Sequence, residues 1–345
     1  MKVLVMTPIY PTPDRPSIGT FVRTQVESLK QAGVEVQVFH LHGRFRKWNY
    51  PKAVFQLRRR LRNNPIDLIH AHIGFAGMVA RTQWKVPVVV TFHGSDLLGL
   101  INAQGKKGWL SPLVVGAGRM LARHVHAAIV QNGKMAALLD NQPNVFVISC
   151  EVDLKTFQPT ERSQARAALG LEQDKKYLLF AANPQIAVKR FPLAQAVAEE
   201  LKRRDASTEL LVVYKEPQDR LALHMSACDA LVFTSYQEGS PNIIKQAMAC
   251  NLPIVSTDVG DVREVIARTR GCCVCDADVE SLVRRLERVL ADRERTDGRA
   301  RVQHLAGPVV ARNIIRVYEH VLGKRACPIQ KPSPTGVLIP DQRNQ

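Results

Sequence analysis

The sequence predicts an α/β protein made of two doubly wound, Rossmann-like domains that face each other across a cleft. Its 345 residues exceed what one hydrophobic core usually supports. Short apolar runs rich in β-branched residues alternate with amphipathic stretches of helical period, an order typical of parallel sheets covered by helices on both faces. The polar residues 158–163 interrupt this alternation, which then begins again and so indicates a second unit of the same kind.

The first unit begins with a strand, a loop and a helix. The helix Thr20–Ala32 carries its apolar residues on one side, and Gly33 follows at a position that commonly ends a helix. The expected strands are Val3–Met6, Val34–Phe39, Leu68–Ala71, Val86–Phe92, Ala127–Val130 and Val145–Ile148. Further helices are expected after Pro51 and near residues 75–84 and 110–123.

The second unit repeats the pattern. Its expected strands are Tyr177–Ala182, Leu210–Val213, Ala230–Thr234 and Pro253–Ser256, with helices near 192–203, 241–250 and 279–291. We interpret Gly271–Cys275 as a short buried strand and not as a metal cluster, because no histidine lies near its cysteines in the sequence.

These elements divide the chain into four parts. Residues 1–158 form the predicted N-terminal domain and residues 159–306 the C-terminal domain. A terminal helix, Val309–Val321, lies within residues 307–323 and is expected to pack back on the N-terminal domain. The proline-rich residues 324–345 are expected to form a disordered tail.

Positive charge is concentrated in the first half of the chain. The net charge is +17, and residues 1–150 hold 19 Lys or Arg against 6 Asp or Glu. Residues 44–62 carry eight basic residues and no acidic one, while Val54, Leu57 and Leu61 recur at helical spacing. Such a helix suits an anionic membrane surface or a charged partner; alternatively, its apolar side belongs to the core and its basic side is solvated. No nucleic-acid-binding motif accompanies the charge, so we expect no nucleic acid partner.

Cysteine usage and the length of the apolar runs indicate the compartment. The seven cysteines form an odd set, which is typical of reduced thiols in the cytosol. No run reaches the ~18 to 20 apolar residues of a membrane span, and the apolar start is too short for a signal peptide. We expect a cytoplasmic protein, peripheral on the inner membrane face if the basic helix binds lipid.

Two loops of the first unit carry residues suited to ligands. Gly19 precedes the helix 20–32, where the free N–H groups of a helix start can bind an anion. His93 and Asp96 follow a strand at its carboxyl end, the edge where parallel sheets bind ligands. His70 and His72 share one face of a strand, but they have no carboxylate partner that would make a metal site. The full G-x-G-x-x-G fingerprint is absent, which counts against a nicotinamide dehydrogenase.

The most informative loop joins the strand 230–234 to the helix near 241–250. Glu238 stands just past the strand, at the edge that faces the cleft. The dipole and first amides of the helix suit phosphate oxygens. Gly239, Ser240 and Pro241 precede this helix, and the helix itself carries Asn242 and Gln246.

Glu238, followed after seven residues by Gln246, resembles the paired acidic signature of retaining GT-B glycosyltransferases of family 4, also called glycosyl transferases group 1. Other segments match that family in the same order: Gly19–Val22, His70–His72, Thr91–Asp96, Val152–Phe157 and Ala247–Gly260. The resemblance covers about residues 2–322.

The resemblance implies a division of labour. The N-terminal domain would hold a saccharide or lipid-linked acceptor, with His72 and Asp96 on the acceptor side, and the C-terminal domain would hold a nucleotide-diphosphate sugar. Glu238 would bind hydroxyls of the donor sugar, His93 would contact that sugar or its phosphate, and Lys189 would neutralise the leaving diphosphate. The other donor-binding positions would be Gly19, Arg190, Gly239, Ser240, Pro241, Asn242 and Gln246. Family members typically retain anomeric configuration without a metal, so no cofactor is expected, and the implied setting is cell-envelope polysaccharide biosynthesis.

Three positions depart from the family pattern. Gln246 replaces the second glutamate, and Ile186 stands where an arginine normally accompanies the lysine. Glu151 replaces a glycine, where it would strain a positive-φ turn and bring negative charge near the donor. These departures leave open the alternative of a non-catalytic relative that binds a partner or a sugar nucleotide.

Overall fold

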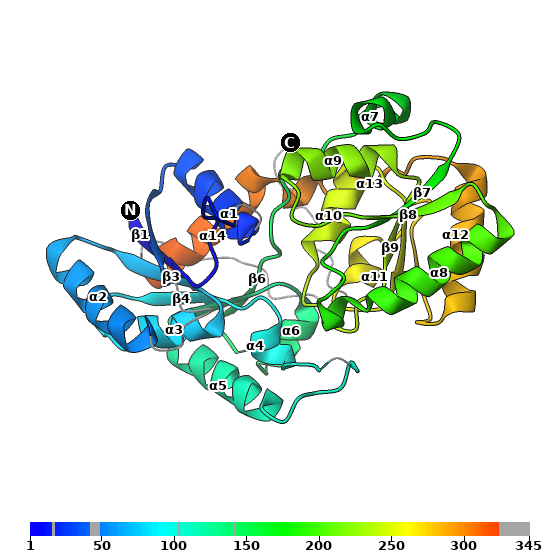
Figure 1. Ribbon diagram of the computed structural model, residues 1–345. Coiled ribbons are helices and arrows are strands. Elements are labelled where there is room, and N and C mark those ends of the chain that lie inside the picture. Colours follow the sequence, from blue (N-terminus) through cyan, green and yellow to red (C-terminus); the bar gives the residue numbers. More distant parts are fainter. Residues whose placement is uncertain (16–17, 42–48, 103, 141, 324–345) are drawn as a thin grey trace.

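The computed structural model describes residues 1–323 except 16–17, 42–48, 103 and 141, so the predicted tail lies outside the described residues. Two α/β domains lie side by side, each built on one parallel sheet (Figure 1). The N-terminal sheet has the order β2-β1-β3-β4-β5-β6. Its strands are β1 (Lys2–Thr7), β2 (Glu35–His40), β3 (Leu68–His72), β4 (Val88–Thr91), β5 (Ala127–Val130) and β6 (Val145–Val147).

Helices cover both faces of this sheet. Alternate residues of β1 point to opposite faces, so that Leu4 and Met6 pack with one group of helices while Val3 and Val5 pack with another. The first group is α2 (Asn49–Asn63), α3 (Gly74–Ala80) and α5 (Ser111–His124), and the second is α1 (Thr20–Gln31) and α14 (Gly307–Val321). The short helices α4 (Ser95–Leu98) and α6 (Gly133–Ala137) follow the carboxyl ends of β4 and β5.

The C-terminal sheet has the order β11-β10-β9-β7-β8. Its strands are β7 (Lys176–Phe180), β8 (Thr208–Val212), β9 (Ala230–Phe233), β10 (Ile254–Thr257) and β11 (Cys273–Cys275). One face packs against α8 (Phe191–Arg204) and α12 (Val279–Asp292), and the other against α9 (Gln218–Ala227), α10 (Asn242–Ala249) and α11 (Val262–Val265). Two parallel sheets, each between two layers of helices, confirm the predicted fold class.

The chain crosses between the domains a second time near its end. After α13 (Gly298–Arg301) and the 3-10 turn η2 (Gln303–Leu305), α14 leaves the C-terminal domain and packs against α1. Val310, Ile314 and Val317 of α14 are buried in the same cluster as Val22 and Val26 of α1. The two crossing segments touch through a parallel bridge between Val152 and Ala306.

Some elements differ from the sequence expectations. Helix α7 (Arg162–Leu169) begins inside the polar stretch that was expected to be a linker, because the Glu161 carboxylate accepts the N–H of Gln164 and caps it. Helix α9 lies where no helix is expected. The expectation that Gly271–Cys275 forms a buried strand is wrong in its burial, since β11 is an edge strand with partly exposed residues.

The apolar side of helix α2 belongs to the core of the N-terminal domain. Leu57 and Leu61 are buried in the N-terminal core, and Val54 packs partly against it. The basic side chains of its described part face outward. Within the described residues, no helix combines the length and apolar character that crossing a bilayer needs.

Candidate active site

The loops that leave β4 and β9 meet where the two domains adjoin. A Cβ added to Gly94 would lie 3.3 Å from the amide nitrogen of Gly239, so the two backbones approach closely. The side-chain amide of Asn132 donates to the carbonyl of Gly239 over 2.6 Å, and that of Gln237 donates to the carbonyl of Gly99 over 2.8 Å. Because these bonds join loops of both domains, they fix the geometry of the site between them.

Between these loops lies a cavity of about 320 Å³. It brings together His93, Lys189 and Glu238, the three predicted catalytic residues, which come from three separate loops. The N-terminal domain and its exit segment contribute Phe21, His93, Gln131 and Cys150, and the C-terminal domain contributes Ala181, Lys189, Glu238, Ser240, Pro241, Asn242 and Ile243.

Lys189 and Glu238 form an ion pair in the cavity wall. The Nζ of Lys189 donates to Oε1 of Glu238 over 2.6 Å, and the two side chains are 25% and 17% exposed. Lys189 ends the 3-10 turn η1 (Ala187–Lys189), and the Thr234 hydroxyl donates to the Lys189 carbonyl, which ties this turn to the end of β9. A partly desolvated pair held in one geometry can offer carboxylate oxygens to sugar hydroxyls and an ammonium to a developing negative charge.

The start of α10 forms the adjoining wall. No side chain of the described residues caps this helix, and Pro241, Asn242 and Ile243 all line the cavity. The first N–H groups of a helix have no intrahelical partner and carry partial positive charge, so an anion placed here would be stabilised. The Ser240 hydroxyl is already engaged, because it donates to a carboxylate oxygen of Asp261.

A stack of three histidines begins at His93 in the cavity wall and continues through His72 to His70. The ring centroids are 4.5 Å apart for His70 and His72 and 5.3 Å apart for His72 and His93. Burial lowers the pKa of His93 to about 3, with a further contribution from Lys245, and burial also lowers the pKa of His70 and His72. At neutral pH His93 therefore presents an uncharged imidazole to the cavity.

His72 and Asp96, the predicted acceptor-side residues, lie outside the lining of this cavity. His72 is only 1% exposed, and its Nδ1 shares a 3.0 Å hydrogen bond with Nε2 of His93. The buried carboxylate of Asp96 accepts the backbone N–H groups of Gly74 and His93 over 3.2 and 3.3 Å. Burial raises the pKa of Asp96. The contacts of both residues position His93 and its loop.

Gly19 and Gln246 also lie outside the cavity lining. Gly19 precedes α1 with a φ of 73°, and a Cβ there would lie 2.6 Å from the carbonyl oxygen of Ile9. The turn itself therefore requires glycine. Gln246 is half-buried on α10, and its amide donates to Gln218 of α9 over 3.1 Å.

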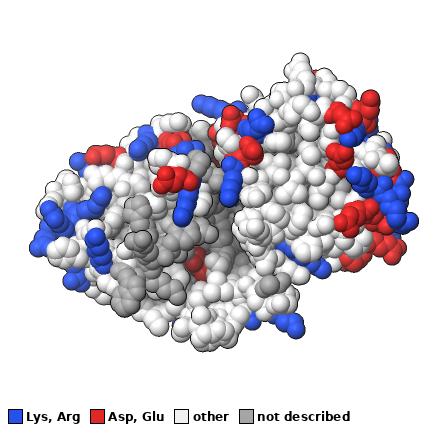
Figure 2. Space-filling view, in the orientation of Figure 1, with Lys and Arg blue, Asp and Glu red and all other residues white. Residues whose placement is uncertain are grey.

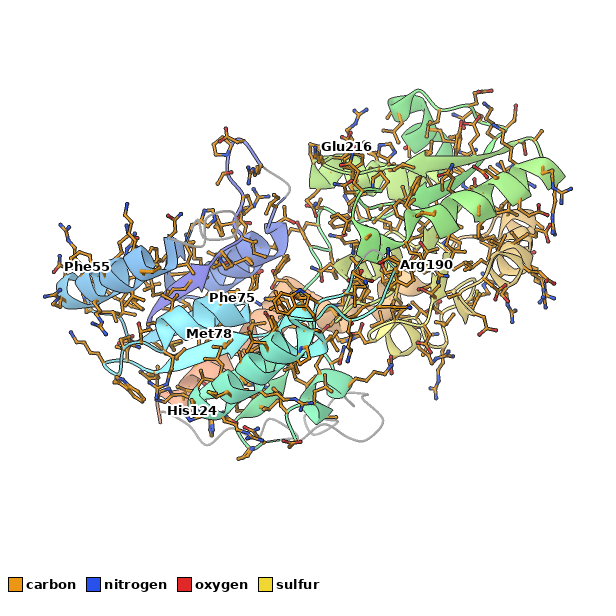
Figure 3. The ribbon with its side chains drawn as sticks, turned by 60° about the horizontal axis from the view of Figure 1, so that its bottom comes forward. Phe55, Phe75, Met78, His124, Arg190 and Glu216 are labelled. Atoms are coloured by element: carbon orange, nitrogen blue, oxygen red, sulfur yellow. The ribbon has the colours of Figure 1, made fainter. Side chains whose placement is uncertain are left out.

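Arg190 does not supply the charge missing at Ile186. Its guanidinium donates to the carbonyl of Ala277 over 3.1 Å and lies 4.8 Å from the ring centroid of Tyr236. Figure 3 labels it on the C-terminal domain, and it is not among the residues that line the cavity. Lys189 and the start of α10 thus supply the positive charge in the cavity wall.

The expectation for Glu151 is wrong in its mechanism. Glu151 is not among the residues with positive φ, so it does not strain a left-handed turn. Its buried carboxylate accepts the Ser28 hydroxyl of α1 over 2.8 Å, and its other oxygen has no hydrogen-bond partner among the described residues. Burial raises the pKa of Glu151 to about 7, against the hydrogen bond from Ser28. The residue lies between α1 and the start of α14, at Gly307, and not in the cavity lining.

Lys245 is a residue that sequence reasoning missed. It is 1% exposed, and its Nζ donates to the Ser149 hydroxyl over 2.7 Å and to the Cys150 carbonyl over 3.2 Å. The Ser149 hydroxyl lies 3.1 Å from that of Ser240 on the cavity wall. Burial lowers the pKa of Lys245, while Cys150 and Asp261 oppose the shift. The signal in the sequence was a lysine within the apolar side of a helix, beside Ile244.

A larger cavity, of about 540 Å³, lies away from the cleft beside α7. Its lining includes the four arginines Arg162, Arg166, Arg293 and Arg295. Asp229, whose side chain is fully buried, attracts Arg162, Arg166 and Arg293 at 2.8 to 3.8 Å. The arrangement fastens α7 to the body of the domain.

Comparison with known proteins agrees with this geometry. Residues 2–146 match the family described as Glycosyl transferase 4-like domain, and residues 171–292 match the family described as Glycosyl transferases group 1. The D-inositol 3-phosphate glycosyltransferase of Frankia alni is 28% identical over 311 residues, which cover 75% of each chain. The glycosyltransferase TuaC of Bacillus subtilis, named for teichuronic acid biosynthesis, is 23% identical over 84% of this chain and 89% of its own. The solved structure of Anabaena Alr3699/HepE in complex with UDP has a TM-score of 0.65 at 16% identity, over 93% of this chain and 100% of that one.

This architecture is the GT-B fold of glycosyltransferases, in which two Rossmann-like domains face each other across a cavity. The two family matches together take in most of the chain. The chain belongs to the group 1 glycosyltransferases, family 4.

Proposed function

We propose that the protein is a retaining glycosyltransferase that moves a sugar from a nucleotide-diphosphate sugar to a saccharide or lipid-linked acceptor. The observation that carries this proposal is the Lys189–Glu238 pair, 2.6 Å apart, beside the uncapped start of α10 in one cavity. Both charged groups that a donor sugar diphosphate needs are present and close together. The structure of HepE with UDP supports a nucleotide diphosphate as the ligand of this fold.

In the proposed reaction, the bond between the anomeric carbon and the diphosphate oxygen breaks, and a bond to the acceptor oxygen forms. Lys189 and the first amides of α10 stabilise the negative charge that develops on the diphosphate. Glu238 accepts hydrogen bonds from donor-sugar hydroxyls and fixes the sugar, and the neutral His93 hydrogen-bonds the same sugar or its phosphate. Retention requires the acceptor oxygen to approach from the side the diphosphate leaves, and a diphosphate oxygen then takes the acceptor proton. Because these groups supply the positive charge, we propose that no metal is needed.

The acceptor would bind from the N-terminal domain side. One relative is named a D-inositol 3-phosphate glycosyltransferase, and another is named for teichuronic acid biosynthesis. These names support an acceptor in cell-envelope polysaccharide biosynthesis. We propose that the reaction takes place in the cytoplasm, and at the inner membrane face if the acceptor is lipid-linked; the positive charge of residues 44–62 supports the latter.

Calorimetric titration with UDP, GDP and ADP tests the donor site. We expect saturable binding of one nucleotide, and we expect Lys189→Ala to weaken it about tenfold, the effect of losing one charged hydrogen bond. Lys202→Ala on the exposed side of α8 removes the same charge away from the cavity and serves as control. If none of the three nucleotides binds at millimolar concentration, the proposal fails, and the alternative of a non-catalytic relative that binds a partner replaces it.

A further inference from the structure

Large exposed apolar side chains gather on one part of the N-terminal domain. Among the described residues, the most exposed of these side chains are Trp109 at 87%, Trp84 at 79% and Leu113 at 71%. Of the twelve exposed large apolar residues in the described part of the chain, eight fall between residues 55 and 120: Phe55, Phe75, Trp84, Leu100, Trp109, Leu110, Leu113 and Met120. Single exposed apolar residues are ordinary, whereas a group of this size on one part of a surface marks an interaction site.

Three adjacent helices present half of this group, namely Phe55, Phe75, Leu113 and Met120. Helix α3 contacts both α2 and α5 on one face of the sheet. Figure 3 shows Phe55, Phe75, Met78 and His124, from all three helices, on the face that is turned forward. The exposed residues of these helices, with the half-buried Met78, form what we call the α2–α3–α5 face: Lys52, Phe55, Arg58, Arg59, Arg62, Phe75, Met78, Leu113, Arg119, Met120 and Arg123.

This face is also strongly basic. Residues 49–124 hold eleven Lys or Arg against two acidic residues, and one of those, Asp96, is buried. Within the described residues, the ion pair that involves this stretch is Arg123 with Asp140, at 3.4 Å. The C-terminal domain differs, because its basic and acidic side chains lie together, as at Arg204 and Glu287. Figure 2 shows this contrast, with mainly Lys and Arg at the outer end of the N-terminal domain and mixed charges on the C-terminal domain.

We propose that the α2–α3–α5 face docks on the surface of an anionic bilayer. The side chains of Phe55, Leu113 and Met120 would enter the boundary between headgroups and acyl chains, and the basic side chains around them would meet lipid phosphates. A polyanion such as RNA matches the charge but not the exposed leucine, methionine and phenylalanine. An apolar protein partner matches those residues but gives the cations no counterpart. An anionic lipid surface matches both at once.

The position of the face adds a consequence for the acceptor. Helix α3 begins at Gly74, whose N–H binds the same Asp96 carboxylate that holds the loop of His93. Phe75 of the α2–α3–α5 face is therefore adjacent in sequence to Gly74, which shares the Asp96 carboxylate with the loop of His93. A lipid-linked acceptor in the docked bilayer would reach the cavity past the start of α3. This consequence rests on the proposed function, whereas the docking itself does not.

Sedimentation with vesicles tests the docking without donor or acceptor. The full chain is spun with vesicles of phosphatidylcholine alone and with vesicles that also contain phosphatidylglycerol. We expect binding to the second kind only. The variant F55S/L113S/M120S and the variant R58Q/R59Q/R62Q should each lower the partition coefficient at least about tenfold. The control R203Q/R284Q/R288Q removes three exposed charges from α8 and α12 and should bind as the wild type does.

Three results would overturn the proposal. One is equally poor binding of the wild type to both vesicles at low salt, and another is a control that loses as much binding as the charge variant. The third is an apolar variant that binds undiminished, because that would show contact by charge alone. Thermal unfolding of each variant checks that it is folded, and Phe55→Ser and Leu113→Ser tested singly replace the triple variant if it is not. UDP binding measured on the same samples separates failure of docking from failure of the donor site.

Discussion

Replacing Glu151 by glutamine should stabilise the protein at neutral and higher pH. Glu151 is buried between α1 and α14, where one carboxylate oxygen accepts the Ser28 hydroxyl and the other finds no hydrogen-bond donor in the part of the chain that the structure describes. A glutamine carbonyl can accept the same hydroxyl without placing a charge in that site. The variant therefore isolates the cost of the charge from the cost of the packing.

The magnitude follows from the pKa of Glu151, which burial raises from 4.5 to about 7. Below pH 4.5 the carboxyl is protonated in both folded and unfolded chains and costs nothing. Between pH 4.5 and 7 the unfolded chain releases the proton first, so the free energy of unfolding falls as the pH rises. Each tenfold step in that proton equilibrium is worth about 1.4 kcal/mol, so the full loss above pH 7 is about 3 kcal/mol.

Urea unfolding at pH 4.5 and at pH 8 measures this difference directly. We expect the wild type to lose about 3 kcal/mol more than Glu151→Gln between the two pH values, with the difference arising between pH 4.5 and 7. Comparing how much the free energy of unfolding changes between the two pH values cancels any cost of the new amide that does not depend on pH. If the two proteins lose stability in parallel, Glu151 titrates normally in the folded protein and the reasoning from its burial is wrong.

Three further changes test other parts of the structure. Gly19→Ala should lower the free energy of unfolding by about 1 to 3 kcal/mol, because its φ is 73° and the new Cβ would lie 2.6 Å from the Ile9 carbonyl. Gly133→Ala, which has open space around it, should cost little, and equal melting points for the two variants would refute the account. Asn132→Ala removes both the cap of α6 and the bond to Gly239, so it should cost about 1 to 2 kcal/mol in chemical unfolding; a loss no greater than that of Asn64→Ala, at an exposed site, would contradict this. If the ribose extends past the cavity lining to Gln246, Gln246→Glu should tighten nucleotide binding about fivefold in calorimetry, since a carboxylate is the stronger acceptor for a ribose hydroxyl; unchanged affinity would remove Gln246 from the donor site.

The fold could be predicted because its strands are recognisable as apolar runs in the sequence. Strands such as β1 and β4 are buried on both faces, so they appear as continuous apolar runs and not as alternating ones. The edge strand β11 is short and partly exposed, and its burial was misjudged for that reason. Helix α9 has a weak amphipathic pattern, because Arg220 and His224 interrupt its apolar residues, and its existence could not be read from periodicity.

The site residues could be predicted where their place in the site follows from their position after a strand end or a turn. Glu238, Lys189 and His93 follow strand ends or a tight turn, and the loops of a parallel sheet converge at that edge. Side-chain direction was not predictable, because it depends on tertiary neighbours. Arg190 turns to the Ala277 carbonyl, and the buried Lys245 reaches Ser149 on the segment that leaves the N-terminal sheet. Glu151 likewise owes its raised pKa to helices more than a hundred residues apart.

Hydrolysis of the nucleotide sugar that the titration identifies, followed by proton NMR, tests the central claim most directly. We predict slow release of a sugar that first appears with the anomeric configuration of the donor. Glu238→Gln should slow this release about 100-fold, while Glu280→Gln, at an exposed carboxylate on α12, should leave it unchanged. A sugar that first appears with inverted configuration would contradict the retaining mechanism. An unchanged rate in Glu238→Gln would show that the cavity beside Lys189 is not where the glycosidic bond breaks.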